Sequence, residues 1–280
     1  MEYIKPFLEN ILSESKTSND IFKRNLIKEY LQITVLEFIY AHPKYSQLFF
    51  YGGSCLAHCF GLPRLSEDLD FIDKGKKINM DELANDLEKY FKENIDIGKN
   101  VEAKSQKFRV YLKFPILHEL GLSSGSKEDT DLLFLKVEVF SGFDFCEKYD
   151  TEIRPIFKFN RSVLIKTFDL PTLMASKIGA ILERKWEKTD KTGKILIKVK
   201  GRDYFDLMWY LEKGIKPNLK CIENIKDGED LKKKLLSIIS KIDSSSIRLD
   251  LDAFIDNEVL VKNISSNLKD ILVREIKEKI

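Results

Sequence analysis

Residues 51–73 read YGGSCLAHCFGLPRLSEDLDFID, and this stretch decides the fold that the sequence predicts. The apolar residues 48–51 predict a short strand, and the Gly-Gly-Ser turn at 52–54 leads from it into a short helix over 55–60. Residues 65–72 predict a second strand. A helix therefore begins at a glycine turn directly after one strand, and the chain then returns as another strand.

Outside this stretch the hydrophobic pattern separates into two groups of elements. The first group is mixed, with helices over 3–41 and 80–91 and strands over 108–114, 132–140 and 155–159. The second group is helical, over 170–185, 204–211, 231–242 and a charged C-terminal segment. We therefore predict an α+β fold, with an α/β domain at residues 1–166 that includes N-terminal helices at 1–42, and a helical domain at 167–280.

Composition excludes several classes of protein. The 280 residues contain 47 Lys and Arg against 45 Asp and Glu, so bulk charge predicts neither a nucleic-acid coat nor a membrane-surface protein. No apolar stretch reaches the ~20 residues needed to cross a bilayer, and the N-terminus has no secretory signal pattern. The four cysteines are sparse and unpatterned. We expect a soluble, cytoplasmic protein with reduced cysteines and no membrane partner.

The glycine turn and the second strand carry residues suited to phosphate and metal chemistry. Gly52 and Gly53 let the backbone approach a ligand closely, and the free amides of the helix start, with the Ser54 hydroxyl, suit a phosphate. Asp68 and Asp70 are two residues apart, so on a strand both face one side, roughly 6–7 Å apart. A divalent cation such as Mg²⁺ relieves their mutual repulsion. Each pattern alone is common in turns and solvated edges, but together they indicate metal-assisted attack on a nucleotide phosphate.

This combination resembles the nucleotidyltransferases of the DNA polymerase beta superfamily, and within it the AbiEii/AbiGii toxins, which include the MenT-type enzymes. That group combines a glycine turn, a short helix ending near a glycine, and an Arg-x-Ser-x-Asp-x-Asp-Phe segment. These features are present as Gly52, Gly53, Ser54, Gly61, Arg64, Ser66, Asp68, Asp70 and Phe71. The resemblance implies a mixed nucleotidyltransferase sheet flanked by helices, with Arg64 and Ser66 near the bound nucleotide.

The group also carries a Lys and Arg on one helix and an Arg-Asp-x-x-Asp-Leu segment, matched here by Lys177, Arg184 and residues 202–207. Lys177 borders an apolar helical stripe, which favours a phosphate contact over a lysine that merely reaches solvent. Arg184 lies two turns on and is either a second phosphate contact or a solvated charge at the helix end. Asp203 or Asp206 is expected to serve as a metal ligand, a base or an anchor for the lysine; Asp203 is the first choice because it follows Arg202.

Two further features have open interpretations. Glu138 stands on a predicted strand where related enzymes place a third catalytic acid, and it is a weak candidate metal ligand or an exposed glutamate. The basic residues between the two helices suit RNA phosphates, but acidic residues interleave with them, so a solvated loop is equally compatible. This set comprises Lys185, Lys188, Lys191, Lys194, Lys198, Lys200 and Arg202, with Trp186 among them.

The resemblance implies a toxin enzyme that transfers a nucleoside monophosphate from a nucleoside triphosphate, with one or two Mg²⁺ ions. The implied acceptor is RNA, the tRNA 3′ end in particular, and the implied partner is a separately encoded antitoxin. Two alternatives remain open: nucleotidyl transfer to a small molecule or a protein, and a catalytically silent binding module that retains the fold.

Overall fold

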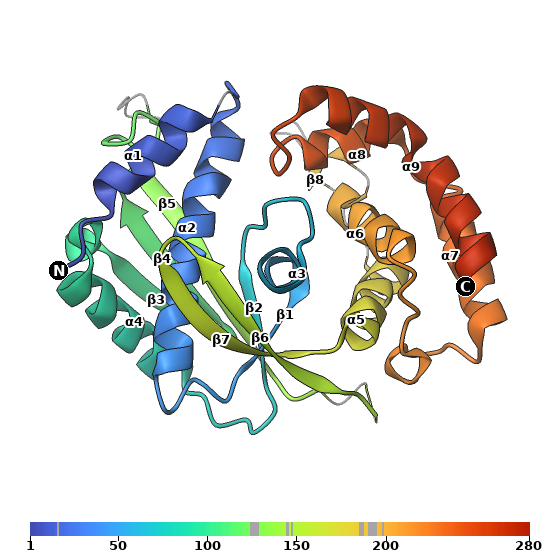
Figure 1. Ribbon diagram of the computed structural model, residues 1–280, viewed down its shortest axis with the longest axis horizontal. Coiled ribbons are helices and arrows are strands. Elements are labelled where there is room, and N and C mark those ends of the chain that lie inside the picture. Colours follow the sequence, from blue (N-terminus) through green and yellow to red (C-terminus); the bar gives the residue numbers. More distant parts are fainter. Residues whose placement is uncertain are drawn as a thin grey trace. The chain divides into compact units, whose positions relative to one another are not determined.

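The computed structural model describes residues 1–15, 17–123, 129–143, 146, 148–184, 188–189, 195–197 and 199–280 (Figure 1). The chain divides into two compact units. Unit 1 contains Met1–Phe143 and Ile153–Thr167, and unit 2 contains Asp144–Glu152 and Phe168–Ile280. Unit 1 combines a sheet with helices, and the helices of unit 2 make it largely α-helical, so the predicted α+β class is confirmed.

A seven-stranded mixed sheet forms the centre of unit 1. Its strands are β1 (Phe49–Tyr51), β2 (Leu69–Asp73), β3 (Glu102–Gln106), β4 (Arg109–Pro115), β5 (Leu132–Ser141), β6 (Thr151–Lys158) and β7 (Arg161–Phe168). Their order is β3-β4-β5-β2-β1-β7-β6. Strand β2 runs parallel to β5 and antiparallel to β1, so the strand after the glycine turn lies in the middle of the sheet.

Helices cover the sheet on the side of its buried residues. They are α1 (Lys5–Glu14), α2 (Asp20–Ala41), α3 (Gly52–Phe60) and α4 (Met80–Asn94), with the short 3-10 helix η1 (Asp96–Asn100). Helix α4 packs on β3 and β4, α2 packs on β5, and α3 packs on β1 and β2 (Figure 1). The apolar stripe of α4, including Leu83, Leu87 and Phe91, is fully buried, as its helical spacing predicts.

Unit 2 is built around one buried helix. Its helices are α5 (Leu170–Glu183), α6 (Gly201–Glu212), α7 (Gly228–Ile239), α8 (Ser244–Leu251) and α9 (Glu258–Lys279), with the 3-10 helix η2 (Leu219–Cys221) and the short strands β8 (Lys188–Thr189) and β9 (Ile195–Ile197). Helix α6 contacts α5, α8 and α9, and nearly all of its residues are buried. Within the described part of the chain, no helix is both long and apolar enough to span a bilayer.

One shifted strand boundary and two unpredicted strands each have a physical reason. Strand β2 begins at Leu69 rather than at residue 65, because the carbonyl groups of Leu65 and Ser66 accept hydrogen bonds from side chains. Strand β3 was not predicted, since its inward positions are the small residues Ala103 and Ser105 and give no apolar alternation. Strand β7 was not predicted either, because apolar residues occupy both of its faces.

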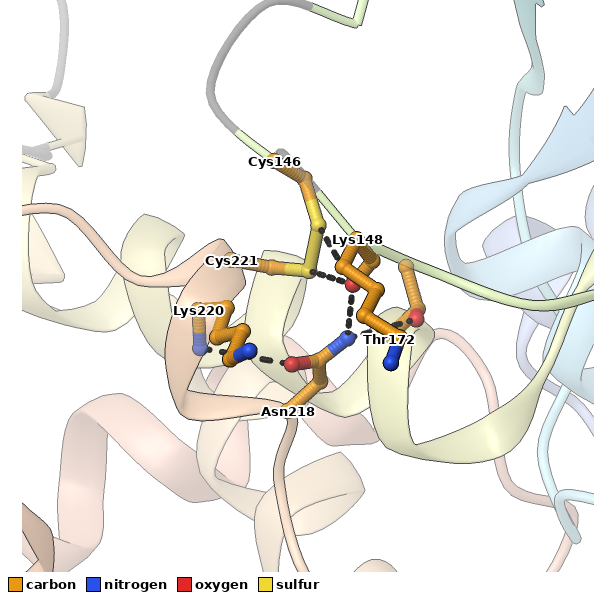
Figure 2. The surroundings of a disulfide bond; sticks show 6 residues. All are labelled: Cys146, Lys148, Thr172, Asn218, Lys220 and Cys221. Atoms are coloured by element: carbon orange, nitrogen blue, oxygen red, sulfur yellow. Dashed lines mark hydrogen bonds between the residues drawn. A yellow bond between two sulfur atoms is a disulfide. The ribbon is translucent and has the colours of Figure 1, made fainter.

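The expectation that all four cysteines are reduced is wrong for one pair. Cys146 and Cys221 form a disulfide across 75 residues of sequence, next to the Lys148 carbonyl, which also accepts a hydrogen bond from the Asn218 side chain at 2.7 Å (Figure 2). Cys55 and Cys59 are free. The pairing depends on where the fold places the segment before β6 beside η2, and cysteine spacing carries no such information.

Reduction of this disulfide is expected to destabilise the protein. The loop of 75 residues corresponds to about 4 kcal/mol of chain entropy removed from the unfolded state. Urea unfolding of the oxidised protein should therefore show a higher midpoint than unfolding in dithiothreitol. Cys221→Ser should unfold at the lower midpoint under both conditions, whereas equal midpoints for oxidised and reduced wild type would show that the bond contributes nothing.

Candidate active site

The two glycines of the turn make room for other side chains of the same site. Gly52 has φ +79°, and a Cβ atom there would lie 2.3 Å from Oδ2 of Asp70. A Cβ atom on Gly53 would lie 2.8 Å from Nη2 of Arg64 and 3.0 Å from Oγ of Ser66. The turn, the arginine, the serine and the second aspartate of the motif are therefore packed against one another.

The start of α3 has no side-chain cap. Tyr51 is the N-cap residue and makes no side-chain hydrogen bond to the helix, so its side chain does not satisfy the amides of the first turn. The Ser54 hydroxyl differs from expectation, because it is buried and donates to the Asp68 carbonyl. Ser54 thus ties the glycine turn to the aspartate segment, and its hydroxyl hydrogen does not point to solvent.

The three candidate acids, Asp68, Asp70 and Glu138, lie on one side of the sheet, but they do not form a three-residue metal site. Asp70 pairs in register with Glu138 on β5, and Asp68, just before β2, lies with Oδ2 3.3 Å from Nζ of Lys136. Glu138 forms an ion pair with Arg109. Among the described residues no group of three or more His, Cys, Asp or Glu side chains could hold a metal ion. Glu138 is therefore an ion-pair partner of Arg109 in this structure. Asp68 and Asp70 remain as the candidate metal ligands.

The sequence analysis did not identify two residues that support the Ser66 segment, Gln32 and His58. The Gln32 side-chain amide donates to the Ser66 carbonyl at 2.9 Å, and its oxygen lies 2.9 Å from Nε2 of His58. Burial lowers the pKa of His58 to about 3, so the ring is neutral and Nε2 donates to Gln32. Gln32 is polar yet lies on the buried side of α2, and that was the available signal.

The predicted residues of the helical half also come together, within unit 2. Nζ of Lys177 lies 2.9 Å from Oδ1 of Asp203 and 2.8 Å from Oδ2 of Asp206. Nη1 of Arg184 lies 2.8 Å from Oδ2 of Asp203. Lys177, whose side chain is 13% exposed, therefore has two carboxylate partners beside the apolar stripe of α5.

Neighbouring positive charges keep Asp203 ionised despite its burial. Burial on its own raises the pKa of Asp203, but the charges of Lys177, Lys200 and Arg184 outweigh it and hold that pKa well below its usual range. Burial also lowers the pKa of Lys200 to about 8. Unit 2 therefore presents a preorganised group of cations and carboxylates near neutral pH.

The basic segment predicted between the two helices is only partly described. Lys185, Trp186, Lys191, Lys194 and Lys198 lie outside the described residues, and of Lys188 only the backbone is described. Arg202 is not directed to solvent, because its Nε lies 3.3 Å from Oδ2 of Asp250 and its guanidinium lies 4.0 Å from the Phe254 ring centroid. That cation contributes to the packing of unit 2.

A comparison with protein families decides the family. Residues 35–273 match the model of the family described as nucleotidyl transferase AbiEii toxin, type IV toxin–antitoxin system. The chain belongs to this family. It is accordingly a nucleotidyltransferase of the AbiEii toxin type, and the resemblance inferred from the glycine turn and the Asp-x-Asp segment is confirmed.

The comparison with solved structures gives matches from two bacteria. JHP933 from Helicobacter pylori is 15% identical over 90% of this chain and 93% of its own, with TM-score 0.44. A candidate nucleotidyltransferase from H. pylori is 16% identical over 90% and 96%, also with TM-score 0.44. The CD-NTase CdnG of Bradyrhizobium diazoefficiens, in complex with GTP, is 13% identical over 96% and 75%, with TM-score 0.24. Among curated proteins none matches this sequence.

The residues of this AbiEii-family chain fit a divalent metal ion of the Mg²⁺ type. Asp68 and Asp70 supply hard oxygen ligands, and proteins commonly bind Mg²⁺ with one or two carboxylates, the substrate phosphates and water. The site already places one positive charge, the Lys136 ammonium, against Asp68. The half-buried Asp70 carboxylate lies beside the turn where Gly52 lacks a Cβ atom, so a cation held by this acid would lie close to an anion bound at the start of α3.

Gly52→Ala is expected to impair activity more than stability. The new Cβ atom would displace the Asp70 carboxylate, and the positive φ adds strain of about 1 kcal/mol. Gly61→Ala is the matched control, since Gly61 has φ +75° and no atom within 4 Å of the added Cβ. Both variants should unfold at similar urea concentrations. Only Gly52→Ala should lose nucleotidyl transfer, by about a hundredfold or more, and equal activity of the two variants would contradict this geometry.

Proposed function

We propose that this AbiEii-family enzyme transfers a nucleoside monophosphate from a nucleoside triphosphate to an RNA acceptor, the 3′ end of a tRNA. The observation that carries the proposal is the contact geometry of unit 1. A helix start without a side-chain cap and the Asp70 carboxylate are neighbours across Gly52. A polyanion at the amides and a cation at the acid would thus meet in one place, as phosphoryl transfer requires.

The residues of the turn would hold the triphosphate. The backbone amides of Gly53 and Ser54 would bind phosphate oxygens at the start of α3. Arg64 is buried and directs its guanidinium toward Gly53, and Ser66 lies beside it, so both would contact the same phosphates. A guanidinium held in this way needs little reorganisation when the substrate binds.

Asp68 and Asp70 would hold one or two Mg²⁺ ions. A bound ion supplies charge neutralisation on the phosphates and acidifies a hydroxyl near it. Lys136 would give up part of its interaction with Asp68 when the ion arrives, because both cations compete for the same carboxylate. Glu138 could assist only after leaving Arg109.

Two basic residues of unit 2 are also proposed phosphate contacts. Lys177 would contact the triphosphate, and Asp203 and Asp206 would keep its ammonium charged and oriented. Arg184, whose side chain is 38% exposed, would be a further phosphate contact. Of the roles expected for Asp203 and Asp206, their contacts favour that of anchors for Lys177.

The chemical step is an in-line displacement at the α-phosphorus. The acceptor hydroxyl oxygen forms the new bond to phosphorus and gives its proton to solvent water, and the bond to the pyrophosphate oxygen breaks. Pyrophosphate leaves with the charge that the amides, Arg64 and Lys177 would neutralise. Modification of a tRNA end would stop translation and explain toxicity, which a cognate antitoxin would restrain.

Labelled nucleotides test the proposed function directly. The purified chain is incubated with each α-labelled ribonucleoside triphosphate and, separately, with total RNA, a protein extract or aminoglycosides. Label should enter RNA of tRNA size, and EDTA should abolish it because the carboxylates would have no ion to hold. Label confined to protein or to an aminoglycoside would overturn the RNA assignment. Incorporation that EDTA leaves unchanged would overturn the metal assignment.

A further inference from the structure

Three neighbouring strands of unit 1 leave one face of the sheet largely polar. Val110, Leu112 and Phe114 of β4 are fully buried, so the alternate residues of that strand point to the other face. Strands β3 and β5 alternate in the same way. The polar outward residues of the three strands are Glu102, Lys104, Gln106, Arg109, Tyr111, Lys113, Lys136 and Glu138, and the apolar ones are Pro115, Leu132, Phe134 and Phe140.

This is the face on which Asp70 stands. Asp70 is in register with Glu138, and Glu138 is in register with Arg109, so the three side chains form one row across the sheet. The next row contains Lys136 and Tyr111. The outward surface of β5, β4 and β3 is therefore a continuation of the carboxylate site.

A hollow lies on this surface beyond the acids. It has a volume of about 340 Å³ and is lined by Lys104, Ser105, Gln106, Tyr111, Lys113 and Phe134. Phe134 is 38% exposed, which is high for a phenylalanine in a central position of a sheet. Lys113 is held only loosely, because its Nζ lies 3.7 Å from Glu102, whose side chain is 63% exposed.

The strand order puts this surface on the side of the acids away from the proposed triphosphate site. The triphosphate site proposed above lies at the start of α3, where β1 meets β2. In an in-line displacement the attacking oxygen and the leaving pyrophosphate lie on opposite sides of the α-phosphorus. Strands β5, β4 and β3 follow β2 on the side away from β1. An acceptor that reaches the acids opposite the pyrophosphate would cross these three strands.

We propose that Lys104, Gln106, Tyr111, Lys113 and Phe134, here termed the acceptor face, bind the single-stranded end of the RNA acceptor. Tyr111 and Phe134 stack on bases, and Lys104 and Lys113 contact phosphates. Aromatic rings flanked by ammonium groups on an open sheet suit unpaired bases, since every base offers a flat π-face. The inference rests on the proposed function for its acceptor and extends it to a defined surface.

Binding of a fluorescein-labelled, short single-stranded RNA, followed by anisotropy without nucleotide, tests the acceptor face. Tyr111→Ala with Phe134→Ala should weaken binding by at least about tenfold. The matched control is Phe157→Ala, an aromatic residue 77% exposed on β6 of the same sheet, which should bind as the wild type does. Lys104→Ala with Lys113→Ala should reduce the slope of log affinity against log salt by about 1.4.

The outcomes separate this inference from the proposed function. Wild-type binding that the aromatic double variant retains would overturn the acceptor face, even if the enzyme labels RNA. Absence of any wild-type binding to single-stranded RNA would overturn it as well. If the enzyme labels only protein or a small molecule, the labelling assay overturns the proposed function. The binding assay still shows whether the acceptor face binds single-stranded RNA. Phe134→Ser alone, at a partly exposed position, repeats the test if the double variant does not fold.

Discussion

Asp68→Ala combined with Asp70→Ala is expected to abolish nucleotide transfer while the protein remains folded. Both carboxylates are partly exposed, and the Asp68 side chain, 26% exposed, is in a surface ion pair with Lys136 that contributes about 1 kcal/mol at most. Removing them therefore costs little stability. It also removes the hard oxygen ligands of unit 1 that we propose to hold the metal, so activity should fall by at least about a thousandfold.

The measurement is incorporation of labelled nucleotide into RNA, with circular dichroism and urea unfolding on the same samples. Glu29→Ala is a suitable control, because Glu29 forms an ion pair with Lys158 at 2.7 Å in the same unit and lies outside the proposed site. Its activity should match that of the wild type. Full activity in the aspartate double variant would end the assignment of the acids, whatever the stability data show.

Local sequence pattern was sufficient for the centre of unit 1. A strand, a glycine turn, a helix and a second strand follow one another within residues 49–73, and each depends on neighbours in the sequence. From the sequence, we explained Gly52 and Gly53 by the need for the backbone to approach a ligand closely. The structure adds that Asp70 and Arg64 occupy the space that a Cβ atom would need.

Contacts between distant residues could not be obtained in this way. The sequence indicated that Lys177 needed a partner, but hydrophobic spacing does not identify which residues of another helix face it. The sequence assigned the Ser54 hydroxyl to phosphate, whereas in the structure it donates to the Asp68 carbonyl. That hydrogen bond spans 14 residues and leaves no mark on the hydrophobic periodicity, so the sequence could not reveal it. Lys136 went unnoticed for the same reason: its proximity to Asp68 follows from the parallel pairing of β2 and β5, which only the sheet order reveals.

Lys177→Met is expected to destabilise the protein by about 3–5 kcal/mol, the usual cost of leaving buried carboxylates without their cation. The side chains of Asp203 and Asp206 are 5% and 0% exposed, so water cannot replace the lost ammonium. Arg184→Met is the control, because the Arg184 side chain is 38% exposed and its ion pair within the described part of the chain is with Asp203. It should cost about 1 kcal/mol or less in the same urea experiment.

The pH dependence of this loss has a definite sign. In the wild type the pKa of Asp203 is depressed by Lys177, Lys200 and Arg184, so its contribution to stability is present above the unfolded pKa of about 3.9 and is lost on acidification. Without Lys177 that pKa rises, and protonation relieves the buried charge. The difference in stability between wild type and Lys177→Met should therefore narrow as the pH falls from 7 toward 4. A difference that stays constant would contradict the ion-pair explanation.

A rescued variant separates the two roles that Lys177 could have. Asp203→Asn with Asp206→Asn removes the buried negative charge, so adding Lys177→Met to this pair should cost much less stability than Lys177→Met alone. Calorimetry on folded protein then compares the affinity for a nucleoside triphosphate of the Asp203→Asn, Asp206→Asn double variant with that of the triple variant that also carries Lys177→Met. If Lys177 also contacts the triphosphate, the triple variant should bind at least about tenfold more weakly. Equal affinity would restrict Lys177 to holding unit 2 together and would move the phosphate contact to Arg184 or to the glycine turn.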